Sequence, residues 1–245
     1  MINADTVINE AVEWIKSTVE GAGAKGVVFG LSGGIDSAVV AALCKKAYPS
    51  DSLGVIMPCY SNPIDEEHAI AVAEAIGLET KTVVLDQAFD SMKSVLGVRE
   101  SDPRLAVANI KSRLRMITLY YYAGLRNYLV SGTGNRCEFT IGYFTKYGDG
   151  GADIMPLTSL VKSEVVELAY KLGIPEAVII KPPTAGLWEN QTDENEMGMT
   201  YTELDNYILT GEAEEHIKKK VDAMNKRSEH KRTMAPRFVP SEKQD

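Results

Sequence analysis

Residues 26–37 read GVVFGLSGGIDS, a short apolar run that breaks into two serines, two glycines and an aspartate. The apolar residues 26–31 have the length and branching of a buried strand, and the AVVAALCKKA that follows Ser37 has the composition of a helix. A glycine-rich turn between a strand and a helix directs its backbone N–H groups, and the positive end of the helix, toward one point in space. This stretch therefore predicts an anion site, for phosphate above all.

The rest of the chain alternates short apolar runs with helical patterns. We expect an amphipathic helix over residues 1–20, then strands at 26–31, 52–58, 79–86 and 128–135 and helices at 36–47, 63–77, 103–127 and 156–173. Strands that alternate with helices indicate right-handed crossovers and a parallel sheet covered on both faces. The predicted fold class is therefore α/β, with a Rossmann-like, doubly wound parallel sheet.

A segment of different composition follows this alternation. Residues 181–199, KPPTAGLWENQTDENEMGM, carry two prolines and many polar side chains and show little periodicity. Long loops in compact domains are often lids over a site, and we expect a lid here. Two further helices are expected within residues 200–235. The chain is then one domain over residues 1–245, with a core at about 20–180, the lid and a C-terminal helical tail.

Composition limits the class of protein. The chain has 245 residues, 24% of them charged, and a formal net charge of -8, which argues against a protein that coats nucleic acid. Its three cysteines are scattered without a C-x-x-C pair, as expected in a reducing compartment. The first residues lack the basic region and the uninterrupted apolar stretch of a signal peptide. We expect a cytoplasmic protein.

A second glycine pattern fits a known motif by its letters only. Residues 21–26, GAGAKG, match G-x-G-x-x-G, the fingerprint of dinucleotide-binding folds. That fingerprint must follow a strand and open a helix, whereas this stretch follows a helix and precedes a strand. We interpret it as a connector. A Walker A loop near Ser32 is excluded as well, because no Gly-Lys-Ser/Thr follows the glycines.

The stretch SGGIDS, residues 32–37, resembles the pyrophosphate-binding loop of the N-type ATP pyrophosphatases, the PP-loop family. The glycines would let the backbone approach the phosphates, the serines would donate hydrogen bonds, and Asp36 would hold Mg²⁺. The alternative is a glycine turn with Asp36 as a helix cap. The resemblance implies an adenine nucleotide alpha hydrolase-like fold and cleavage of ATP between its α- and β-phosphates. It implies that ATP is bound by Gly30, Leu31, Ser32, Gly33, Gly34, Ile35, Asp36 and Ser37.

Four further stretches resemble segments of NAD synthetase, and their order and spacing match as well. They are NIKSRLRM (109–116), SGTGNRCE (131–138), GYFTKYGDGGAD (142–153) and SEHKR (228–232). The resemblance covers nearly the whole chain, and the chain length fits the ammonia-dependent form, which has no amide-hydrolysing domain. It implies that deamido-NAD, ATP and ammonia are converted to NAD, AMP and pyrophosphate through an adenylated carboxylate.

The same resemblance implies roles for single residues on the ATP side. Thr133, Lys162 and Thr184 would contact ATP, and Glu138 would be the second Mg²⁺ ligand beside Asp36. Asp36 and Lys162 would be the catalytic residues. Two carboxylates, with phosphate and water, make a good octahedral magnesium site. Taken alone, Glu138 would be interpreted as an exposed helix carboxylate.

On the substrate side, the resemblance implies that deamido-NAD is bound by Arg113, Lys146, Asp153, His230 and Lys231. Taken singly, each of these cations would be an ordinary surface residue. Synthetases of this type are homodimers with the deamido-NAD site at the subunit interface. Residues 118–125, TLYYYAGL, fit such an interface, because one core can hardly bury three tyrosines that face successive directions on a helix.

The sequence departs from the family pattern at two places. Residues 131–133 read Ser-Gly-Thr where many relatives have Leu-Gly-Thr, and Arg136 and Cys137 precede Glu138.

Two other functions stay open as alternatives. One is another PP-loop enzyme: a tRNA-modifying thiolase, a lysidine synthase or a detached synthetase subunit. The acidic charge and the lack of an RNA-binding appendage disfavour it. The other is a non-catalytic nucleotide sensor, which would not need the whole catalytic set.

Overall fold

The computed structural model describes residues 2–184, 186, 188 and 192–240. Within that part of the chain, four parallel strands form one sheet in the order β3–β2–β1–β4. They are β1 (Gly26–Gly30), β2 (Ser52–Ile56), β3 (Glu79–Thr82) and β4 (Tyr128–Ser131). The register pairs Val28 of β1 with Leu53 on one side and with Val130 on the other. Among the described residues, no helix is both long and apolar enough to cross a membrane.

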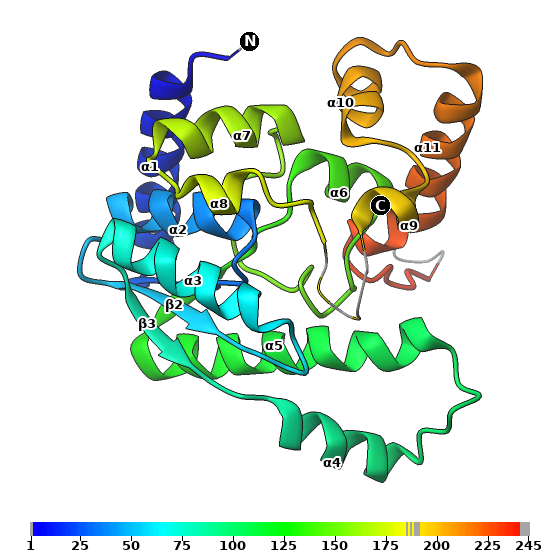
Figure 1. Cartoon of the computed structure of the whole chain (residues 1–245), viewed down its shortest axis with the longest axis horizontal. Helices are drawn as coiled ribbons and strands as arrows, with labels where there is room; N and C mark the ends of the chain where they lie inside the picture. Colours follow the sequence, from blue (N-terminus) through cyan, green and yellow to red (C-terminus); the bar gives the residue numbers. More distant parts are fainter. Residues whose placement is uncertain (1, 185, 187, 189–191, 241–245) are drawn as a thin grey trace.

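Helices cover both faces of this sheet (Figure 1). Val27 and Phe29 of β1 belong to a core shared with α1 (Ala4–Gly21), α2 (Ile35–Ala47), α3 (Pro63–Ile76), α7 (Lys162–Lys171) and α8 (Glu176–Ile179). Val28 belongs to a second core on the opposite face, shared with α4 (Asp86–Leu96) and α5 (Arg104–Arg126). This split follows from the two-residue period of a strand. The predicted α/β class with a doubly wound parallel sheet is confirmed.

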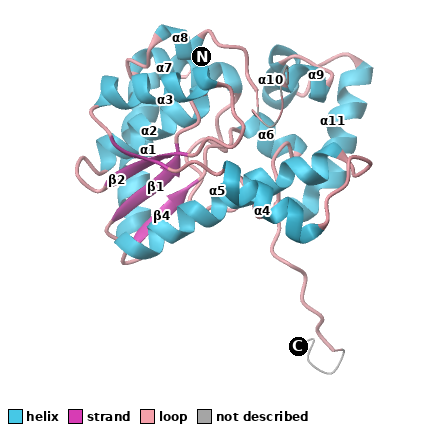
Figure 2. Cartoon of the chain, turned by 60° about the horizontal axis from the view of Figure 1, so that its bottom comes forward, coloured by secondary structure: helices cyan, strands magenta, loops and turns pink. Residues whose placement is uncertain are grey.

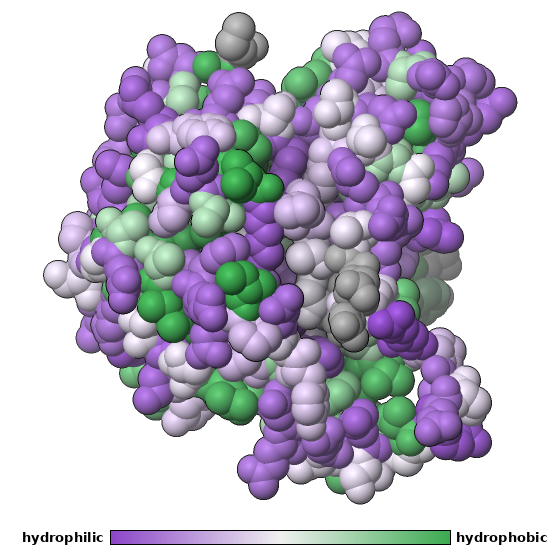
Figure 3. Space-filling model, in the orientation of Figure 1, coloured by the Kyte–Doolittle hydropathy of each residue, from purple (hydrophilic) through white to green (hydrophobic). Residues whose placement is uncertain are grey.

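A further group of helices lies beside the sheet (Figure 2). It consists of α6 (Arg136–Ile141), α9 (Asp193–Met197), α10 (Tyr201–Thr210), α11 (Glu215–Ser228) and the 3₁₀ turn Glu229–Lys231. These helices share a third apolar core built around Met197, Leu204 and Ile217. The space-filling view shows a notch between this lobe and the lobe of α1 and α7 (Figure 3). Because α6 follows β4 almost directly, the lobe is tied to the carboxyl edge of the sheet.

Several expected element boundaries agree with the structure. The helix α3 starts at Pro63, as expected of a residue without the N–H that a first turn leaves unpaired. It ends where Gly77 takes a φ of +63°, which glycine adopts without steric cost. Residues 22–25 connect α1 to β1. The interpretation of residues 21–26, GAGAKG, as a connector is therefore confirmed.

Three expected elements have the wrong extent. The helix expected at 156–173 begins only at Lys162, because residues 156–160 form turns in which the Leu160 carbonyl accepts from the Arg136 N–H (2.8 Å). The strand expected at 128–135 ends at Ser131, since the following residues turn into α6. The strand expected at 79–86 ends at Thr82, and α4 begins at Asp86. In each case a tertiary contact or a helix start overrides local apolar composition.

Candidate active site

The carboxyl ends of β1 and β4 meet where the strand order reverses. The chain runs from β1 outward through β2 to β3, then crosses back and adds β4 on the other side of β1. At such a switch point the two following loops separate and leave a crevice, the usual ligand site of open α/β sheets. Residues 32–34 follow β1 and residues 132–135 follow β4. The two segments that the sequence singled out therefore face one crevice.

The loop after β1 is held in one shape by its own side chains. The Ser37 hydroxyl donates to the Gly34 carbonyl (2.8 Å) and accepts from the Ser32 N–H (3.2 Å). Gly33 has a φ of +75°, and a Cβ there would lie 2.1 Å from the Asp65 carbonyl oxygen, so no other residue fits. Gly34 caps α2 without a side chain. The first turn of α2 is thus open to an anion in the crevice.

Asp36 is the centre of a charged cluster. Its Oδ2 accepts from Lys162 Nζ (2.5 Å) and its Oδ1 accepts from Asn135 Nδ2 (3.0 Å). Three elements far apart in the sequence, α2, α7 and the loop after β4, thereby converge on one carboxylate. Burial lowers the pKa of Lys162, but the charges of Asp36 and Glu138 outweigh burial and leave that pKa raised. Lys162 is therefore a fixed positive charge at neutral pH.

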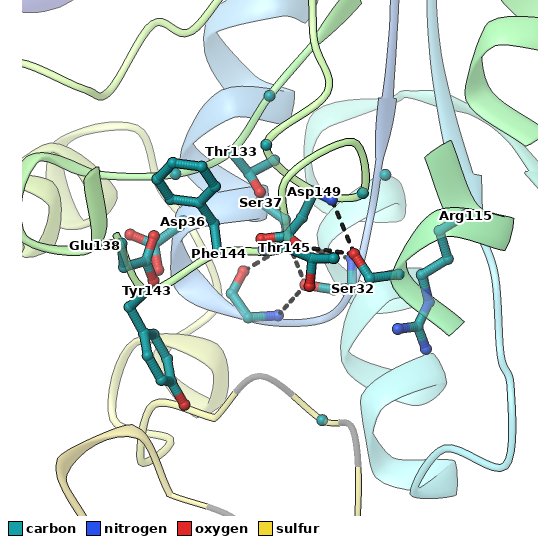
Figure 4. Close-up of a pocket in the computed structure, with 18 of the residues that line it drawn as sticks. Ser32, Asp36, Ser37, Arg115, Thr133, Glu138, Tyr143, Phe144, Thr145 and Asp149 are labelled. Carbon is teal, nitrogen blue, oxygen red and sulfur yellow. Dashed lines mark hydrogen bonds between the residues drawn. The ribbon is translucent and has the colours of Figure 1, made fainter. Parts of the chain in front are cut away.

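Glu138 of α6 lies beside Asp36 (Figure 4). The Asn135 side chain accepts from the Glu138 N–H (3.1 Å), while Glu138 Oε2 accepts from the Asn135 N–H (3.1 Å). This reciprocal capping box starts α6 and aims Glu138 at the crevice. Burial, followed by the charge of Asp36, holds the pKa of Glu138 well above its ordinary value. Glu138 is partly buried in the cavity wall and not an exposed helix carboxylate.

Two side chains of this cluster escaped the sequence analysis. Asn135, which bridges Asp36 and Glu138, carried a usable signal, because N-x-x-E is a capping pattern. Asp193 carried none, since it is one polar residue among many in the expected lid. It is 4% exposed and accepts from the hydroxyls of Tyr143 (3.2 Å) and Tyr201 (3.1 Å). Burial raises the pKa of Asp193, and Lys162 opposes that rise.

The loop of residues 142–151 forms another wall of the cavity and is fastened to α5. The Ser112 hydroxyl donates to Asp149 Oδ1 (2.6 Å), which also accepts from the Thr145 N–H (3.0 Å). Gly148 lies so close that a Cβ there would be 2.2 Å from Ser112 Oγ. Figure 4 draws Thr145 and Asp149 to the right of Glu138, between it and Arg115. Gly148 therefore serves the close packing of this loop on α5.

Main-chain carbonyls position the predicted substrate-binding cations along this wall. Lys231 Nζ donates to the carbonyls of Gly142 (2.7 Å) and Phe144 (2.6 Å), and burial lowers the pKa of Lys231. Lys146 Nζ donates to the carbonyl of His230. Arg113 Nη2 donates to the carbonyl of Lys146 (3.4 Å). Residues 230 and 231 are thereby joined to the loop, which Arg113 in turn joins to α5.

One cavity of about 1010 Å³ joins the two walls. Every predicted ATP-binding residue except Gly33 lines it, as does every predicted deamido-NAD-binding residue except Asp153. Gly33 packs behind the lining, against Asp65. Asp153 accepts from the Val130 N–H (2.8 Å) and the Tyr120 hydroxyl (3.0 Å), beside α5 and outside this cavity. The volume lies at the upper end of the range for small-molecule sites.

Known sequences decide the family. A family model described as NAD synthase matches residues 7–235 of this chain. The chain belongs to the NAD synthase family. Its similarity to the NH3-dependent NAD(+) synthetase of Carboxydothermus hydrogenoformans amounts to 51% identity over 233 residues, which cover 94% of this chain and 96% of that protein. The resemblance drawn from the four sequence stretches is thus confirmed.

Solved structures agree with the family and with the fold. The NMN synthetase from Francisella tularensis has a TM-score of 0.92 at 36% identity, covering 98% of this chain and 100% of that one. The NH3-dependent NAD synthetase from Campylobacter jejuni, solved with a nitrate ion, has a TM-score of 0.80 at 29% identity, covering 98% of this chain and 100% of that one. Family members with this fold therefore include enzymes named for a dinucleotide product and one named for a mononucleotide product.

Proposed function

We propose that this chain is an ammonia-dependent NAD synthetase, a ligase that converts deamido-NAD, ATP and ammonia to NAD, AMP and pyrophosphate in the final step of NAD biosynthesis. One observation carries the proposal. An anion-binding turn, Lys162 and the carboxylates of Asp36 and Glu138 converge on one wall of a cavity whose other wall carries the cations Arg113 and Lys231. Relatives about half identical over nearly the full length are named for this activity.

The chemistry needs charge stabilisation more than a nucleophilic side chain. A carboxylate is a poor electrophile, because attack by nitrogen would have to expel oxide. Transfer of AMP from ATP to the nicotinate carboxylate releases pyrophosphate and supplies a leaving group, and ammonia then displaces AMP to form the C–N bond. The N–H groups at the start of α2 and the ammonium of Lys162 are placed to stabilise the phosphate oxygens.

We assign ATP to the crevice at the switch point of the sheet. Residues 30–37 would hold its phosphates through the open first turn of α2, with Thr133 at the end of β4 and Thr184 across the cavity as further contacts. Lys162 reaches the same space from the start of α7. Because Lys162 now pairs with Asp36, it would exchange this partner for a phosphate when ATP binds.

Mg²⁺ fits this cluster as a partner of ATP. Among the described residues, no group of three or more His, Cys, Asp or Glu side chains could hold a metal ion by itself. Asp36 and Glu138 supply two carboxylates, the oxygen ligands that Mg²⁺ prefers, and phosphate oxygens and water would complete six. Burial and then the charge of Asp36 raise the pKa of Glu138, and a bound cation would favour its ionised form. When bound, Mg²⁺ would neutralise charge on the reacting phosphates.

We place deamido-NAD along the wall of α5 and the loop of residues 142–151. Arg113, Lys146, His230 and Lys231 line the cavity there and suit the pyrophosphate and carboxylate of the substrate. Asp153, next to Tyr120 of α5, would complete the site from outside the cavity of this chain. That placement fits a homodimer in which the deamido-NAD site lies between two copies.

The organisation of the chain belongs to the same proposal. We infer one cytoplasmic domain over residues 1–245, with a core at about 20–180, a lid at 181–199 and a helical tail at 200–235. Of the lid, residues 185, 187 and 189–191 lie outside the described residues. In its described part, Lys181 pairs with Asp65 of α3, and the Trp188 ring lies 4.5 Å from the Arg104 guanidinium of α5. These contacts join the lid to both walls.

A second candidate substrate is the mononucleotide of nicotinate. The observation that favours it is the TM-score of 0.92 with an NMN synthetase, against 0.80 with an NAD synthetase. The chemistry at the carboxylate would be the same, and the difference would lie in whether the adenylyl half of the substrate is bound.

The test is pyrophosphate release from ATP with ammonia and either deamido-NAD or nicotinate mononucleotide. We expect release that depends on ammonia and on Mg²⁺, with the larger kcat/KM for deamido-NAD. A larger kcat/KM for the mononucleotide would favour the second candidate. No release with either substrate would overturn the assignment to this reaction class. Glutamine in place of ammonia serves as the control for the nitrogen donor.

A further inference from the structure

We propose that Asp205 of α10 is a positioning residue that sets the places of Lys162 and Glu138. The inference rests on the proposed function, since it concerns how the ATP side of that site is held. Asp205 is 6% exposed and does not line the cavity. It acts through the residues that do.

At the start of α7, Glu164 Oε2 accepts from the Val161 N–H (2.9 Å), but no described side chain of the helix itself accepts from the N–H groups of Lys162 and Ser163. Its N-cap position is Val161, whose side chain has no acceptor, so the first N–H groups of the helix need partners from elsewhere. Asp205 supplies them: Oδ1 accepts from the Lys162 N–H (3.1 Å) and Oδ2 from the Ser163 N–H (2.8 Å). A carboxylate there is also favoured by the helix dipole. The residue that opens α7 is therefore fixed by a side chain 43 positions later in the sequence.

The same carboxylate holds α6. The thiol of Cys137 donates to Asp205 Oδ1, with a sulfur–oxygen distance of 2.9 Å. Cys137 directly precedes Glu138. Asp205 thereby fixes the backbone next to the second carboxylate of the cluster.

One buried side chain thus joins three helices at the point where two of them present charge to ATP. Lys162 Nζ lies 2.5 Å from Asp36 Oδ2, and Glu138 lies beside that pair. A shift of about 1 Å in a catalytic group can cost on the order of 100-fold in rate. A carboxylate that accepts three hydrogen bonds in a buried place gives the rigid support that such a site needs.

Asp205→Asn is the direct test. The amide keeps the size of the side chain, but only its oxygen accepts, and its NH₂ group would face an N–H donor of α7. We expect kcat to fall about 10- to 100-fold and the KM for ATP to rise about tenfold, with less than about a twofold change in the KM for deamido-NAD. Calorimetric titration with MgATP should show a dissociation constant raised by a similar factor, which measures positioning without turnover.

Glu203→Gln is the matched control in the same helix. Glu203 accepts from the Thr200 N–H (2.7 Å) in the capping box that starts α10, so its loss weakens the helix without removing the bonds to α6 and α7. We expect a lower Tm and an unchanged KM for ATP. If Asp205→Asn changed the kinetic and binding constants no more than Glu203→Gln does, Asp205 would be structural only and the proposal would fail.

Cys137 offers a second pair of variants, which decides the matter if Asp205→Asn does not fold. Cys137→Ser keeps a donor to Asp205, whereas Cys137→Ala removes it. We expect the alanine variant to raise the KM for ATP about threefold over the serine variant. Equal constants in the two would overturn the proposal. An inactive wild-type protein would refute the proposed function itself, whereas an active one with insensitive variants would refute only the role of Asp205.

Discussion

The helices α2 and α5 cover opposite faces of the same sheet, and the chain buries them to very different degrees. Ten of the 13 residues of α2 are buried, between the sheet on one side and α1 and α7 on the other. Of the 23 residues of α5, which the structure describes throughout, four are buried. The helix α2, on the proposed ATP side of the cavity, is thus enclosed within this chain, whereas most of α5, on the proposed deamido-NAD side, stays accessible.

The exposed side of α5 carries a stripe of large hydrophobic side chains. Ile117, Tyr121 and Leu125 are exposed and follow one another at intervals of four residues, which places them on one face of the helix. Arg113, a proposed substrate contact, continues the same face one turn earlier. A second copy that covered the stripe would therefore approach the substrate wall. Tyr122 instead packs in the second core, so the three tyrosines do face different directions, as their spacing predicted.

The largest effect is expected from a substitution on the proposed ATP side of the cavity. Asp36→Asn removes a proposed Mg²⁺ ligand and the ion-pair partner of Lys162, so we expect pyrophosphate release to fall about 100- to 1000-fold with the fold retained. Asp51→Asn, a change at a site that bonds Tyr128 instead, is the matched control and should stay close to wild type. Circular dichroism checks the fold. Near-normal turnover of Asp36→Asn at saturating Mg²⁺ would remove Asp36 from the metal site.

A smaller effect, selective for deamido-NAD over ATP, is expected from a substitution on the exposed face of α5. Tyr121→Asp places a charge in the stripe and should yield monomers whose KM for deamido-NAD rises about tenfold, with less than about a threefold rise for ATP. Tyr170→Asp is the control, because Tyr170 of α7 is 58% exposed against 62% for Tyr121 but lies outside the stripe. Light scattering gives the oligomeric state. A fully active wild-type monomer at assay concentration would contradict the shared site.

The smallest expected effect is a gain in stability. The pKa of Glu138 is raised in the folded protein, so the favourable contribution of its protonated form is complete below the ordinary pKa and is lost as pH rises through the raised one. Glu138→Gln keeps the acceptor of the capping box and removes the buried charge. Without metal at neutral pH, we expect its Tm to exceed that of wild type by a few degrees.

The pH dependence of the Tm shows whether the gain of Glu138→Gln comes from the removed charge or from a general change in stability. The gain of Glu138→Gln should shrink as pH falls toward the ordinary glutamate value, where the wild-type carboxyl is protonated too. Glu203→Gln should behave in the opposite way, because hydrogen bonds from Thr200 lower the pKa of Glu203 and stabilise its ionised form. Thermal melts in EDTA between pH 4.5 and 8 measure both. A pH-independent difference for Glu138→Gln would show that burial does not raise the pKa of its carboxyl.

Much of the fold could be predicted because its determinants are local. The alternation of apolar runs and helical patterns predicted the parallel sheet. The two-residue period of a strand explains why the structure has Val27 and Val28 of β1 in different cores. The phosphate turn could be located for the same reason: Gly33 needs a positive φ, and Ser37 bonds back to Gly34 within four residues. The conformation of such a turn depends on residues that are close together in the sequence, so the sequence is enough to predict it.

The charged cluster depends on contacts that no local pattern records. Lys162 and Asp36 are 126 positions apart, and only the crossing of the chain between β3 and β4 brings their elements to one edge. Asp193 and Asp205 read as ordinary polar residues of a loop and a helix, and burial among donors from other helices gives them their roles. The start of α7 at Lys162 has the same origin, since its cap comes from Asp205.

The amino-acid sequence was enough to predict the alternating strands and helices and the anion-binding turn. Its four family stretches were enough to predict the family. Tertiary structure alone decided which carboxylate pairs with Lys162, why the pKa of Glu138 is raised, and that α5 keeps an apolar stripe while α2 is enclosed. The physical reason is that pKa values and burial depend on the distances between side chains in space, and those distances are fixed only when all three cores have packed.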